Sequence, residues 1–416
     1  MLNFFSKRNI LRPIKPQKNI SKFEFIALIA ALLALNALTI DIMLPALPDI
    51  AQSMGLNNAN DAQLVISSYL FGVGISMLFF GPVADRFGRR APLYFGFIIY
   101  VLTSLAAIIA PSFAMLLLLR FVQGLGTAAF RVVAIAVVRD SYSGRAMAEI
   151  MSLTYMIFMI VPILAPGVGQ IILFAGGWRL IFLFVAITGI VTGVWAYFRL
   201  PETLDKADQR PLTLQSVLGG FKIVLSNQFA TLYAIIPMFM FGALLGFLHS
   251  SQQIFADIYG FGAYFPVAFA GIALAMAIAA YLNSRMVGHF GMRRIAHFAT
   301  IIFLISSILL LLFSLFGEVH IVIFYSLIIV CLFMFSWISA NANSLAMQPL
   351  GKVAGTAASA FGFIQTIGAT AIGMIIGRMF NQTIMPLAIG FSLVGIVCLL
   401  LVLIAEKGKL FGSGEE

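Results

Sequence analysis

The chain has 416 residues, of which 62% are hydrophobic and 10% are charged, and its mean hydropathy is +1.05. Soluble domains carry about 25% charged residues, so this composition excludes a soluble enzyme and a disordered chain and predicts a protein of the lipid bilayer. The formal net charge of +10 is no sign of nucleic-acid binding, because the basic residues flank apolar segments, and two cysteines exclude a disulfide scaffold.

Twelve apolar segments are long enough to cross about 30 Å of hydrocarbon as helices of about 20 residues. They are predicted at 24–45, 62–82, 92–111, 113–136, 150–174, 178–200, 228–250, 264–287, 294–316, 319–342, 354–380 and 383–405. The first segment is too long for the apolar region of a signal peptide and runs into Asp41, Pro45 and Pro48, so we expect it to be retained as a span.

The basic residues lie mostly at one set of span ends. Twenty-one of the 25 Lys and Arg residues fall in the N-terminal tail, in every second loop and in the C-terminal tail. Basic residues beside a span stay preferentially in the cytoplasm, and an even number of spans puts both ends of the chain on one side. Both termini are therefore predicted to be cytoplasmic.

One polar stretch, residues 201–227, divides the spans into six and six. The string Phe87-Gly88-Arg89-Arg90 after span two recurs as FGMRR at 290–294 after span eight, which places Gly291 203 residues after Gly88. Two parallel six-helix halves with a site between them describe a known transporter architecture. We expect a tail at 1–23, a first bundle at 24–200, a linker at 201–227, a second bundle at 228–405 and a tail at 406–416.

Four strings carry a family resemblance, all in the first half of the chain. They are GPVADRFGRR at 81–90, LRFVQGLGTAA at 119–129, APGVGQ at 165–170 and NALTIDIMLPALPDI at 36–50. The first closely resembles the loop signature of the major facilitator superfamily. The others resemble motifs of its twelve-span drug:proton antiporter branch, and the overall pattern is most similar to Bcr/CflA-type multidrug efflux proteins.

The resemblance implies an all-α membrane protein with twelve transmembrane helices in two pseudo-symmetric six-helix bundles. It implies a proton-coupled secondary transporter that exports small amphipathic molecules or drugs by alternating access, with no enzymatic activity. We expect small molecules, protons and membrane lipid as partners, function as a monomer, no cofactor, no metal and no nucleic acid. The bacterial inner membrane is the expected location.

Asp41 and Arg120 are ionisable residues inside predicted spans, where a charge is costly and calls for a partner or a watery cavity. Counting 1.5 Å per residue along spans one and four puts both in the outer half of the bilayer, so they are expected to meet. In one interpretation, protonation of Asp41 weakens this pair and couples proton entry to substrate exit. In the other, the pair is static and only offsets its own desolvation.

Arg131 follows Arg120 by eleven positions, which is close to three full turns, so both side chains are predicted on one helix face that lines a cavity. Arg131 either recognises an anionic or carboxylate-bearing substrate or extends to the cytoplasmic interface. Tyr155, Gln365 and Asn341 are further candidates for substrate binding. His249, also within a span, is another polar candidate and could titrate near neutral pH; the alternative is that it satisfies a helix contact, as a lone membrane histidine more often does.

The loop at 81–90 is assigned a gating role by the family resemblance. Its expected gating residues are Gly81, Asp85, Arg86, Gly88, Arg89 and Arg90. Asp85 is expected to bond an arginine or a helix N-terminus of the opposite half when the cytoplasmic side is closed. The alternative is a solvated loop whose arginines only set topology.

Pro162, Pro166 and Gly167 form the expected antiporter motif on span five. Proline removes a backbone bond and glycine removes bulk, so they are predicted to kink this helix and let a neighbour approach, which membrane helices also do in ordinary packing.

No nucleotide-binding loop or HExxH metal pair is present in the sequence, so ATP-driven transport and metalloenzyme chemistry are not expected. Two alternatives remain open. One is a facilitator, symporter or exporter of a small organic anion held by Arg120 and Arg131, and the other is a membrane sensor that transports nothing.

Overall fold

The computed structural model describes residues 20–142, 144–205, 209 and 226–412. Within these residues the chain forms twelve helical segments that are long and apolar enough to cross a membrane, and no strand. The predicted all-α fold with twelve spans is confirmed. Much of the expected N-terminal tail and of the linker at 201–227 lies outside the described residues.

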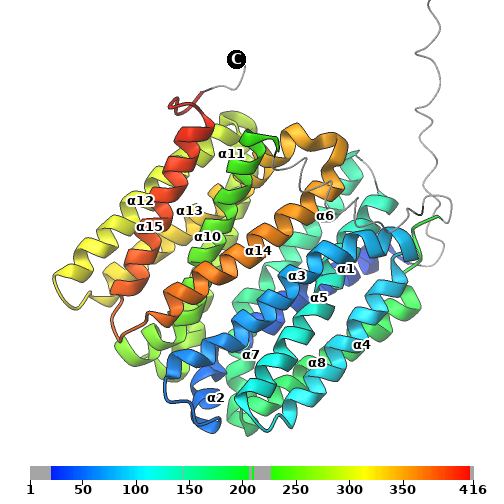
Figure 1. Cartoon of the computed structure of the whole chain (residues 1–416), viewed down its shortest axis with the longest axis horizontal. Helices are drawn as coiled ribbons and strands as arrows, with labels where there is room; N and C mark the ends of the chain where they lie inside the picture. Colours follow the sequence, from blue (N-terminus) through cyan, green and yellow to red (C-terminus); the bar gives the residue numbers. More distant parts are fainter. Residues whose placement is uncertain (1–19, 143, 206–208, 210–225, 413–416) are drawn as a thin grey trace, which may run out of the picture.

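The first six segments form one bundle (Figure 1). Its helices are α1 (Lys22–Asp41), η1 (Leu44–Ala46), α2 (Leu47–Ser53), η2 (Ala59–Gln63), α3 (Leu64–Phe87), α4 (Arg90–Ile108), α5 (Phe113–Ser141), α6 (Gly144–Phe158), α7 (Ile160–Gly176) and α8 (Trp178–Arg199).

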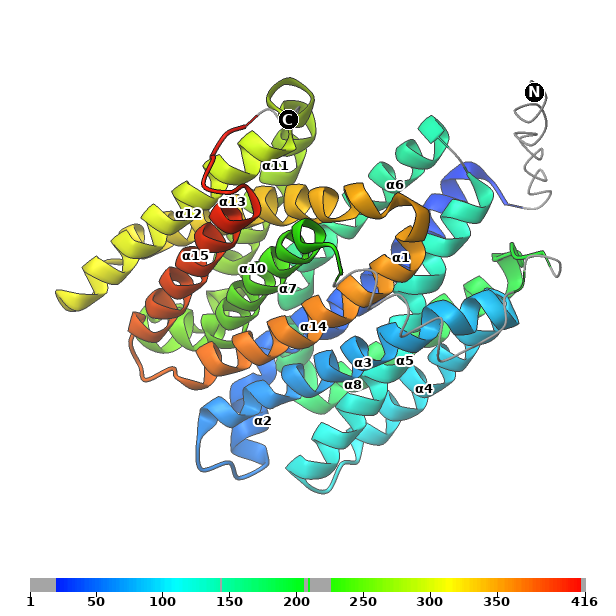
Figure 2. The same ribbon diagram turned by 45° about the horizontal axis from the view of Figure 1, so that its top comes forward.

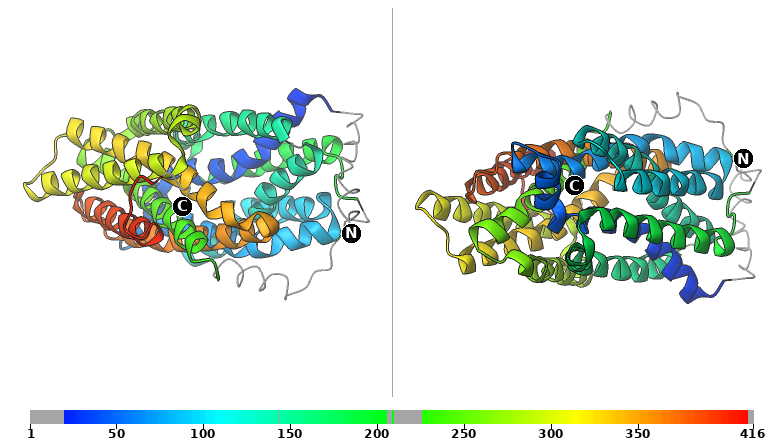
Figure 3. Two further views of the ribbon diagram at one scale, coloured as in Figure 1. Left: turned by 90° about the horizontal axis from the view of Figure 1, so that it is seen from above. Right: turned by 90° about the horizontal axis from the view of Figure 1, so that it is seen from below.

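The second six segments form the other bundle, and Figure 3 shows the two bundles side by side. Its helices are α10 (Gln228–Gln253), η4 (Ile254–Ile258), η5 (Gly262–Tyr264), α11 (Phe265–Phe290), α12 (Met292–Leu315), α13 (Ile321–Met347), η6 (Gln348–Val353), α14 (Ala354–Arg378) and α15 (Met385–Ala405).

The repeated Phe-Gly string ends a helix in the same way in both halves. Gly88 separates α3 from α4 with φ of +88°, and Gly291 separates α11 from α12 with φ of +79°. A residue with a side chain rarely adopts this left-handed conformation, so glycine fixes both turns. The shared turn geometry supports the internal duplication predicted from the sequence.

Two predicted spans are interrupted, and proline accounts for both breaks. Span one ends as α1 at Asp41 and continues through η1 and α2, each of which has a proline in its first turn. Span five is divided into α6 and α7 at Met159, three residues before Pro162. A proline ring clashes with the carbonyl group four residues earlier, which here belongs to Phe158, the last residue of α6.

Large apolar side chains cover the outside of the bundles. Phe174 and Phe198 are 73% and 75% exposed, and many Leu, Ile and Phe residues on other helices are also exposed. A soluble protein rarely exposes apolar surface on this scale, so the surface fits a hydrocarbon environment.

The described chain begins and ends at the same end of the molecule (Figure 2). Between the bundles, α3 lies along α14 and α7 lies along α11. These two contacts leave a central space, which contains the candidate site.

Candidate functional site

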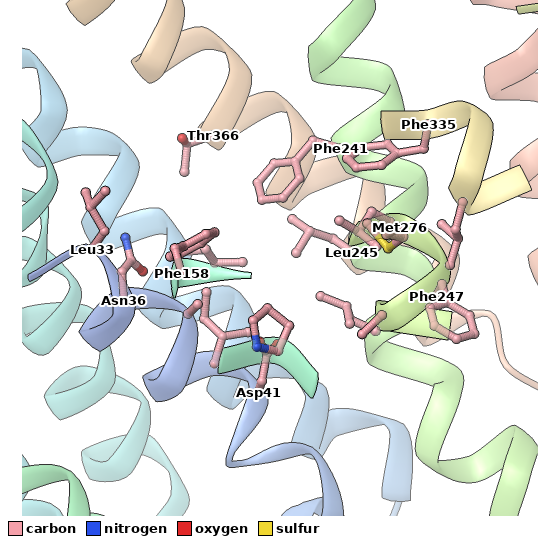
Figure 4. Close-up of a pocket in the computed structure, with 18 of the residues that line it drawn as sticks. Leu33, Asn36, Asp41, Phe158, Phe241, Leu245, Phe247, Met276, Phe335 and Thr366 are labelled. Carbon is pink, nitrogen blue, oxygen red and sulfur yellow. The ribbon is translucent and has the colours of Figure 1, made fainter. Parts of the chain in front are cut away.

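A cavity of about 380 Å³ lies between the two bundles. The first bundle contributes side chains from α1, α3, α5, α6 and α7, and the second contributes side chains from α10, α11, α13 and α14. Figure 4 shows Asn36 and Asp41 of α1 facing Phe241 and Leu245 of α10 across this space. A cavity that both bundles line changes shape when the bundles move relative to each other.

Helix α1 presents one continuous stripe to the cavity, formed by Leu33, Asn36, Ala37, Ile40 and Asp41. Their spacing is that of one face of an α-helix. Asp41 is therefore placed in the cavity by the register of a regular helix and by the end of that helix immediately after it.

Asp41 is the only acidic residue among the side chains that line the cavity. It is 6% exposed, and among the described residues its carboxylate has no hydrogen bond and no ion pair. Its oxygens are not fully buried, so they reach the space of the cavity. A charged carboxylate in such an apolar site is costly, and the site therefore favours occupation by a proton or a cation.

The cavity is closed at one end and open at the other. At the end of the helices that is farthest from the termini, the lining residues Phe247 and Ile272 are no more than 2% exposed. Toward the end that carries the termini, Arg131 and Tyr155 also line the cavity but are exposed. This gradient indicates that the cavity opens toward the end with the termini, which we call the open end.

A group of polar contacts between the bundles lies at the closed end. Asn60 donates through Nδ2 to the carbonyl oxygens of Arg378 and Phe380, at 3.1 and 2.7 Å. Gln253 donates to Asn60 Oδ1 at 2.9 Å and accepts from Gln63 Nε2 at 3.0 Å. We call these residues, together with the ion pair between Asp61 and Arg378 at 2.7 Å, the inter-bundle latch.

Arg120 lies inside the first bundle and is completely buried. Its guanidinium donates to the Val65 carbonyl at 3.1 Å, to Gln123 Oε1 at 2.6 Å and to the Thr39 carbonyl at 3.2 Å. It also lies over the ring of Tyr69, with Cζ 4.6 Å from the ring centroid. Oxygen acceptors and the face of an aromatic ring thus stabilise this buried charge.

The predicted ion pair between Asp41 and Arg120 is absent from the described structure. Arg120 does meet α1, as its depth predicted, but it binds the main chain at Thr39, two residues before Asp41. Asp41 points into the cavity while Arg120 stays within the bundle, because α1 turns Asp41 toward the cavity and the Thr39 carbonyl toward Arg120. The expectation that Arg120 shares a cavity face with Arg131 is also wrong, since only Arg131 lines the cavity.

A buried polar network surrounds Arg120 that the sequence analysis did not predict. Gln123 donates to Ser104 at 2.6 Å, and the hydroxyls of Thr39 and Tyr100 lie 2.6 Å apart. The Tyr69 hydroxyl donates to Asn36 Oδ1 at 3.0 Å, which links this network to a residue of the cavity wall. Thr39, Ser104 and Tyr100 carry no charge, so nothing in the sequence separates them from ordinary packing residues.

The four expected substrate-binding residues divide into two pairs. Arg131 and Tyr155 line the cavity. Asn341 does not: it is 2% exposed and donates to Asn283 Oδ1 at 2.7 Å and to the Trp337 carbonyl at 2.8 Å. Gln365 is also absent from the cavity lining.

Gln365 donates instead to Asn343 Oδ1 at 2.8 Å and to the Ala234 carbonyl at 3.2 Å. Both amides thus make contacts between helices of the second bundle and do not line the cavity in this structure. His249 is 1% exposed and contacts the Gly373 carbonyl at 3.1 Å and Ser67 Oγ at 3.4 Å, as a helix-contact role predicts.

The loop at 81–90 is held within the first bundle. Arg89 is 2% exposed and bonds Asp85 Oδ1 and Asp140 Oδ2, each at 2.7 Å. Burial by itself would lower the pKa of Arg89, but its hydrogen bonds to Asp140 and Asp85 outweigh burial and raise this pKa above its ordinary value. Asp85 thus pairs with its own bundle and not with the opposite half, which was the expected partner in the closed state.

Glu202 completes this cluster and caps the start of α4. Its carboxylate accepts from the backbone N–H of Arg89, at 2.9 and 3.0 Å, and from that of Arg90 at 3.0 Å. The first N–H groups of a helix lack intrahelical partners, so a carboxylate is stabilising there. Arg90 stacks near Tyr94 and Tyr197, while Gly81 lies beside Ser359 of α14. Arg86 lies in the last turn of α3.

In the span-five motif, one glycine differs from the expectation. Pro162 lines the cavity and Pro166 is buried inside α7. Gly167, expected to allow a close approach, has no atom within 4 Å of the position where a Cβ would be. Gly169 fills that role instead, because a Cβ there would meet the Ile42 carbonyl oxygen and Pro45.

A scan of protein families matches the Major Facilitator Superfamily over residues 29–373. The chain is 28% identical over 375 residues to the bicyclomycin resistance protein homolog of Haemophilus influenzae, covering 88% of this chain and 92% of the relative. It is 30% identical over 397 residues to the multidrug resistance protein MdtL of Escherichia coli O157:H7, covering 93% and 96%.

Among solved structures, the chain is similar to a D-xylose-proton symporter with a TM-score of 0.72 and 14% identity, covering 94% of this chain and 100% of that one. This match extends the shared fold over both bundles. Among the described residues, no group of three or more His, Cys, Asp or Glu residues is arranged to hold a metal ion. The family match and the two relatives show that the chain belongs to the Major Facilitator Superfamily and is a multi-pass membrane transporter, not an enzyme.

Proposed function

We propose that the protein exports small amphipathic molecules across the bacterial inner membrane in exchange for protons. The names of its relatives, a bicyclomycin resistance protein homolog and a multidrug resistance protein, support export of drug-like compounds. The cavity supports the amphipathic character of the substrate, because its lining is mostly Leu, Ile, Phe and Met with a few polar groups.

The observation that carries the proposal is the state of Asp41. Among the described residues it is an unpaired carboxylate, and it lies in a mostly apolar cavity between the two bundles. At this position a proton and a cationic group of a substrate compete for the same oxygens. Competition of this kind links proton entry to substrate release when the cavity faces alternate sides of the membrane.

Arg120 supports this exchange from inside the first bundle rather than as a direct partner of Asp41. Its bond to the Thr39 carbonyl fixes the last turn of α1, from which Asp41 projects. Thr39 lies two residues before Asp41, so a change of protonation at Asp41 acts through this turn of α1 on the buried charge of Arg120. We propose this backbone route in place of the ion pair.

The test is transport by the purified full chain in proteoliposomes with an imposed pH gradient and a panel of cationic, neutral and anionic aromatic compounds. The Asp41→Asn variant is expected to lose at least about 90% of the transport driven by the pH gradient, because an amide neither carries a proton nor attracts a cation at neutral pH. It should still fold, since the carboxylate makes no bond that the amide would break.

Asp49→Asn is the matched control, because Asp49 is an exposed acid on α2 that does not line the cavity. It is expected to transport at the wild-type rate. Undiminished pH-driven transport by Asp41→Asn would remove Asp41 from the mechanism. Ligand binding by the wild type without movement of any compound would favour the sensor instead.

A second candidate substrate class, small organic acids, is favoured by Arg131, the basic residue among those that line the cavity. A guanidinium binds a carboxylate through two parallel hydrogen bonds. Arg131→Ala is expected to lower transport of acidic compounds by about tenfold and that of cationic compounds by less than twofold, measured with the same panel. Equal losses for both classes would assign Arg131 a structural role.

We also propose the orientation and the division of the chain. The abundance of basic residues at the open end supports cytoplasmic termini. The helical halves support bundles at 24–200 and 228–405 and a linker at 201–227.

The loop at 81–90 is proposed to exchange the Asp85–Arg89 bond for contacts with the opposite half when the cytoplasmic end closes. We propose that the protein works as a monomer surrounded by lipid.

A further inference from the structure

The two walls of the cavity differ in polarity. The wall from the first bundle carries Asn36, Asp41, Arg131 and Tyr155, whereas the wall from the second bundle has a single polar lining residue, Thr366. Figure 4 shows this division, with Asn36 and Asp41 opposite Phe241 and Phe335. A molecule in the cavity therefore meets polar groups on one side and aromatic groups on the other.

Asn36 differs from the other polar residues of this wall in having one of its two polar atoms already bound. Its Oδ1 accepts the hydrogen bond from Tyr69 at 3.0 Å. Its Nδ2 has no acceptor among the described residues. This atom is not fully buried, so it is accessible from the cavity. The two N–H groups on Nδ2 are thus available to a molecule in the cavity.

Tyr69 holds this amide firmly in place. The tyrosine is completely buried, and its ring lies under the guanidinium of Arg120. Its main chain packs against Gly124 of α5 so closely that a Cβ on Gly124 would meet the Tyr69 carbonyl. A donor held in one orientation loses little entropy when it binds a ligand.

Asn36 and Asp41 are also separated by a fixed distance. Both belong to the stripe of α1 that faces the cavity, five residues apart. A rise of 1.5 Å per residue puts them about 7.5 Å apart along the helix axis. One molecule of drug size spans that distance.

We propose that Asn36 is a specificity-determining residue that donates a hydrogen bond to an acceptor oxygen of the substrate while Asp41 binds its ammonium group. The preferred substrates are then aromatic amines with a carbonyl, ether or hydroxyl oxygen about 7 to 8 Å from the amine. The aromatic body lies against Phe241 and Phe335 on the opposite wall. This inference rests on the proposed function for the role of Asp41, but not on coupling to protons.

The experiment compares binding of two tertiary amines to the purified full chain by calorimetry at a single pH. One compound is an aryl amide with its carbonyl about 7 Å from the amine, and the other has a methylene group in place of that carbonyl. The wild type is expected to bind the carbonyl compound about tenfold more tightly, as for one well-placed hydrogen bond. In Asn36→Leu this preference should fall below about twofold.

Tyr69→Phe provides a second variant that keeps the aromatic ring under Arg120. It leaves Asn36 in place but unanchored, so the preference is expected to fall to about threefold. The matched control is Asn57→Leu, which changes an exposed asparagine far from the cavity lining and should keep the tenfold preference. If Asn36→Leu does not fold, Tyr69→Phe decides the matter.

Equal binding of both compounds by the wild type would overturn the assignment of Asn36, and so would a tenfold preference that survives in both variants. Because binding is measured without a pH gradient, these results are separate from the transport test of Asp41. A protein that prefers the carbonyl compound but does not exchange it for protons keeps Asn36 and loses the proposed coupling.

Discussion

Arg120 shows how a single buried charge organises the first bundle. Its three hydrogen bonds reach α3, α1 and its own helix, and its planar face covers Tyr69. The guanidinium supplies several donors in a fixed plane, whereas the ammonium group of lysine is a smaller and more strongly hydrated charge. The position therefore requires the shape of arginine as well as its charge.

Replacement of Arg120 by lysine is expected to lower pH-driven transport by at least about tenfold and the melting temperature in detergent by about 5 °C. The reason is that lysine cannot bond the Val65 and Thr39 carbonyls and Gln123 in the same geometry. Arg179→Lys, at an exposed arginine beside Trp178, serves as the control and should leave both quantities unchanged. Wild-type transport by Arg120→Lys would show that charge alone is enough.

At this scale the sequence predicted charged site residues better than neutral ones. Asp41 and Arg131 were found because a charge inside an apolar span has few explanations. Asn341 and Gln365 do not line the cavity in this structure, because an uncharged amide also fits a helix contact and sequence does not say which neighbour it faces. Asn36 was missed for the same reason, since only its contact with Tyr69 distinguishes it.

Among the helices, α7 depends on a close approach to the end of α1. The α-carbon of Gly169 lies where a side chain would meet the Ile42 carbonyl and Pro45, so α7 contacts the main chain just beyond Asp41. This contact explains why the antiporter motif on span five and the acidic residue on span one belong to one structural unit.

Gly169→Ala is expected to destabilise the protein by about 1 to 3 kcal/mol, because the added methyl group forces α7 away from α1. The cost would appear as a lower melting temperature in detergent. Gly167→Ala is a matched control two residues away, where a methyl group meets nothing within 4 Å. A larger loss of stability from Gly167→Ala than from Gly169→Ala would contradict the helix packing described above.

The sequence predicted which segments are helices more reliably than where they end. Each predicted span corresponds to one helical segment, but α5 continues to Ser141 rather than 136, and α10 with η4 reaches Ile258 rather than 250. Hydropathy marks the part of a helix inside hydrocarbon, whereas a helix ends where its backbone bonds end. The break at Met159 lies where Pro162 predicted a kink, whereas the break after Asp41, which Pro45 and Pro48 follow, was not predicted.

The whole molecule has one closed end and one open end, and different interactions hold each. Polar contacts of the inter-bundle latch join the halves at the closed end. At the open end, the charged cluster of Asp85, Arg89, Asp140 and Glu202 lies within the first bundle and its adjoining segment. Alternating access requires that the latch break and that the open end close, so the latch should set the balance between the two states.

Asn60→Ala tests this because it removes three of the latch hydrogen bonds at once. The reporter is a cysteine introduced by Leu248→Cys, because Leu248 lines the cavity and is 8% exposed. Cys331 and Cys398 are replaced by alanine in the same protein, so that only the reporter is labelled. Labelling by a membrane-impermeant maleimide from outside the cell is expected to be about tenfold faster, since each bond contributes about 1 kcal/mol and water replaces part of that in the open state.

Asn57→Ala, at an exposed residue just before η2, controls for general effects of substitution there and should not change the labelling rate. If Asn60→Ala also leaves the rate unchanged, the closed end is held by the apolar packing of α3 on α14 and of α7 on α11, and the polar contacts only accompany it. A faster rate in Asn60→Ala alone would show that the latch supplies the free energy that keeps the outer end closed. Binding of substrate and proton at Asp41 must then offset this free energy for the cavity to open outward.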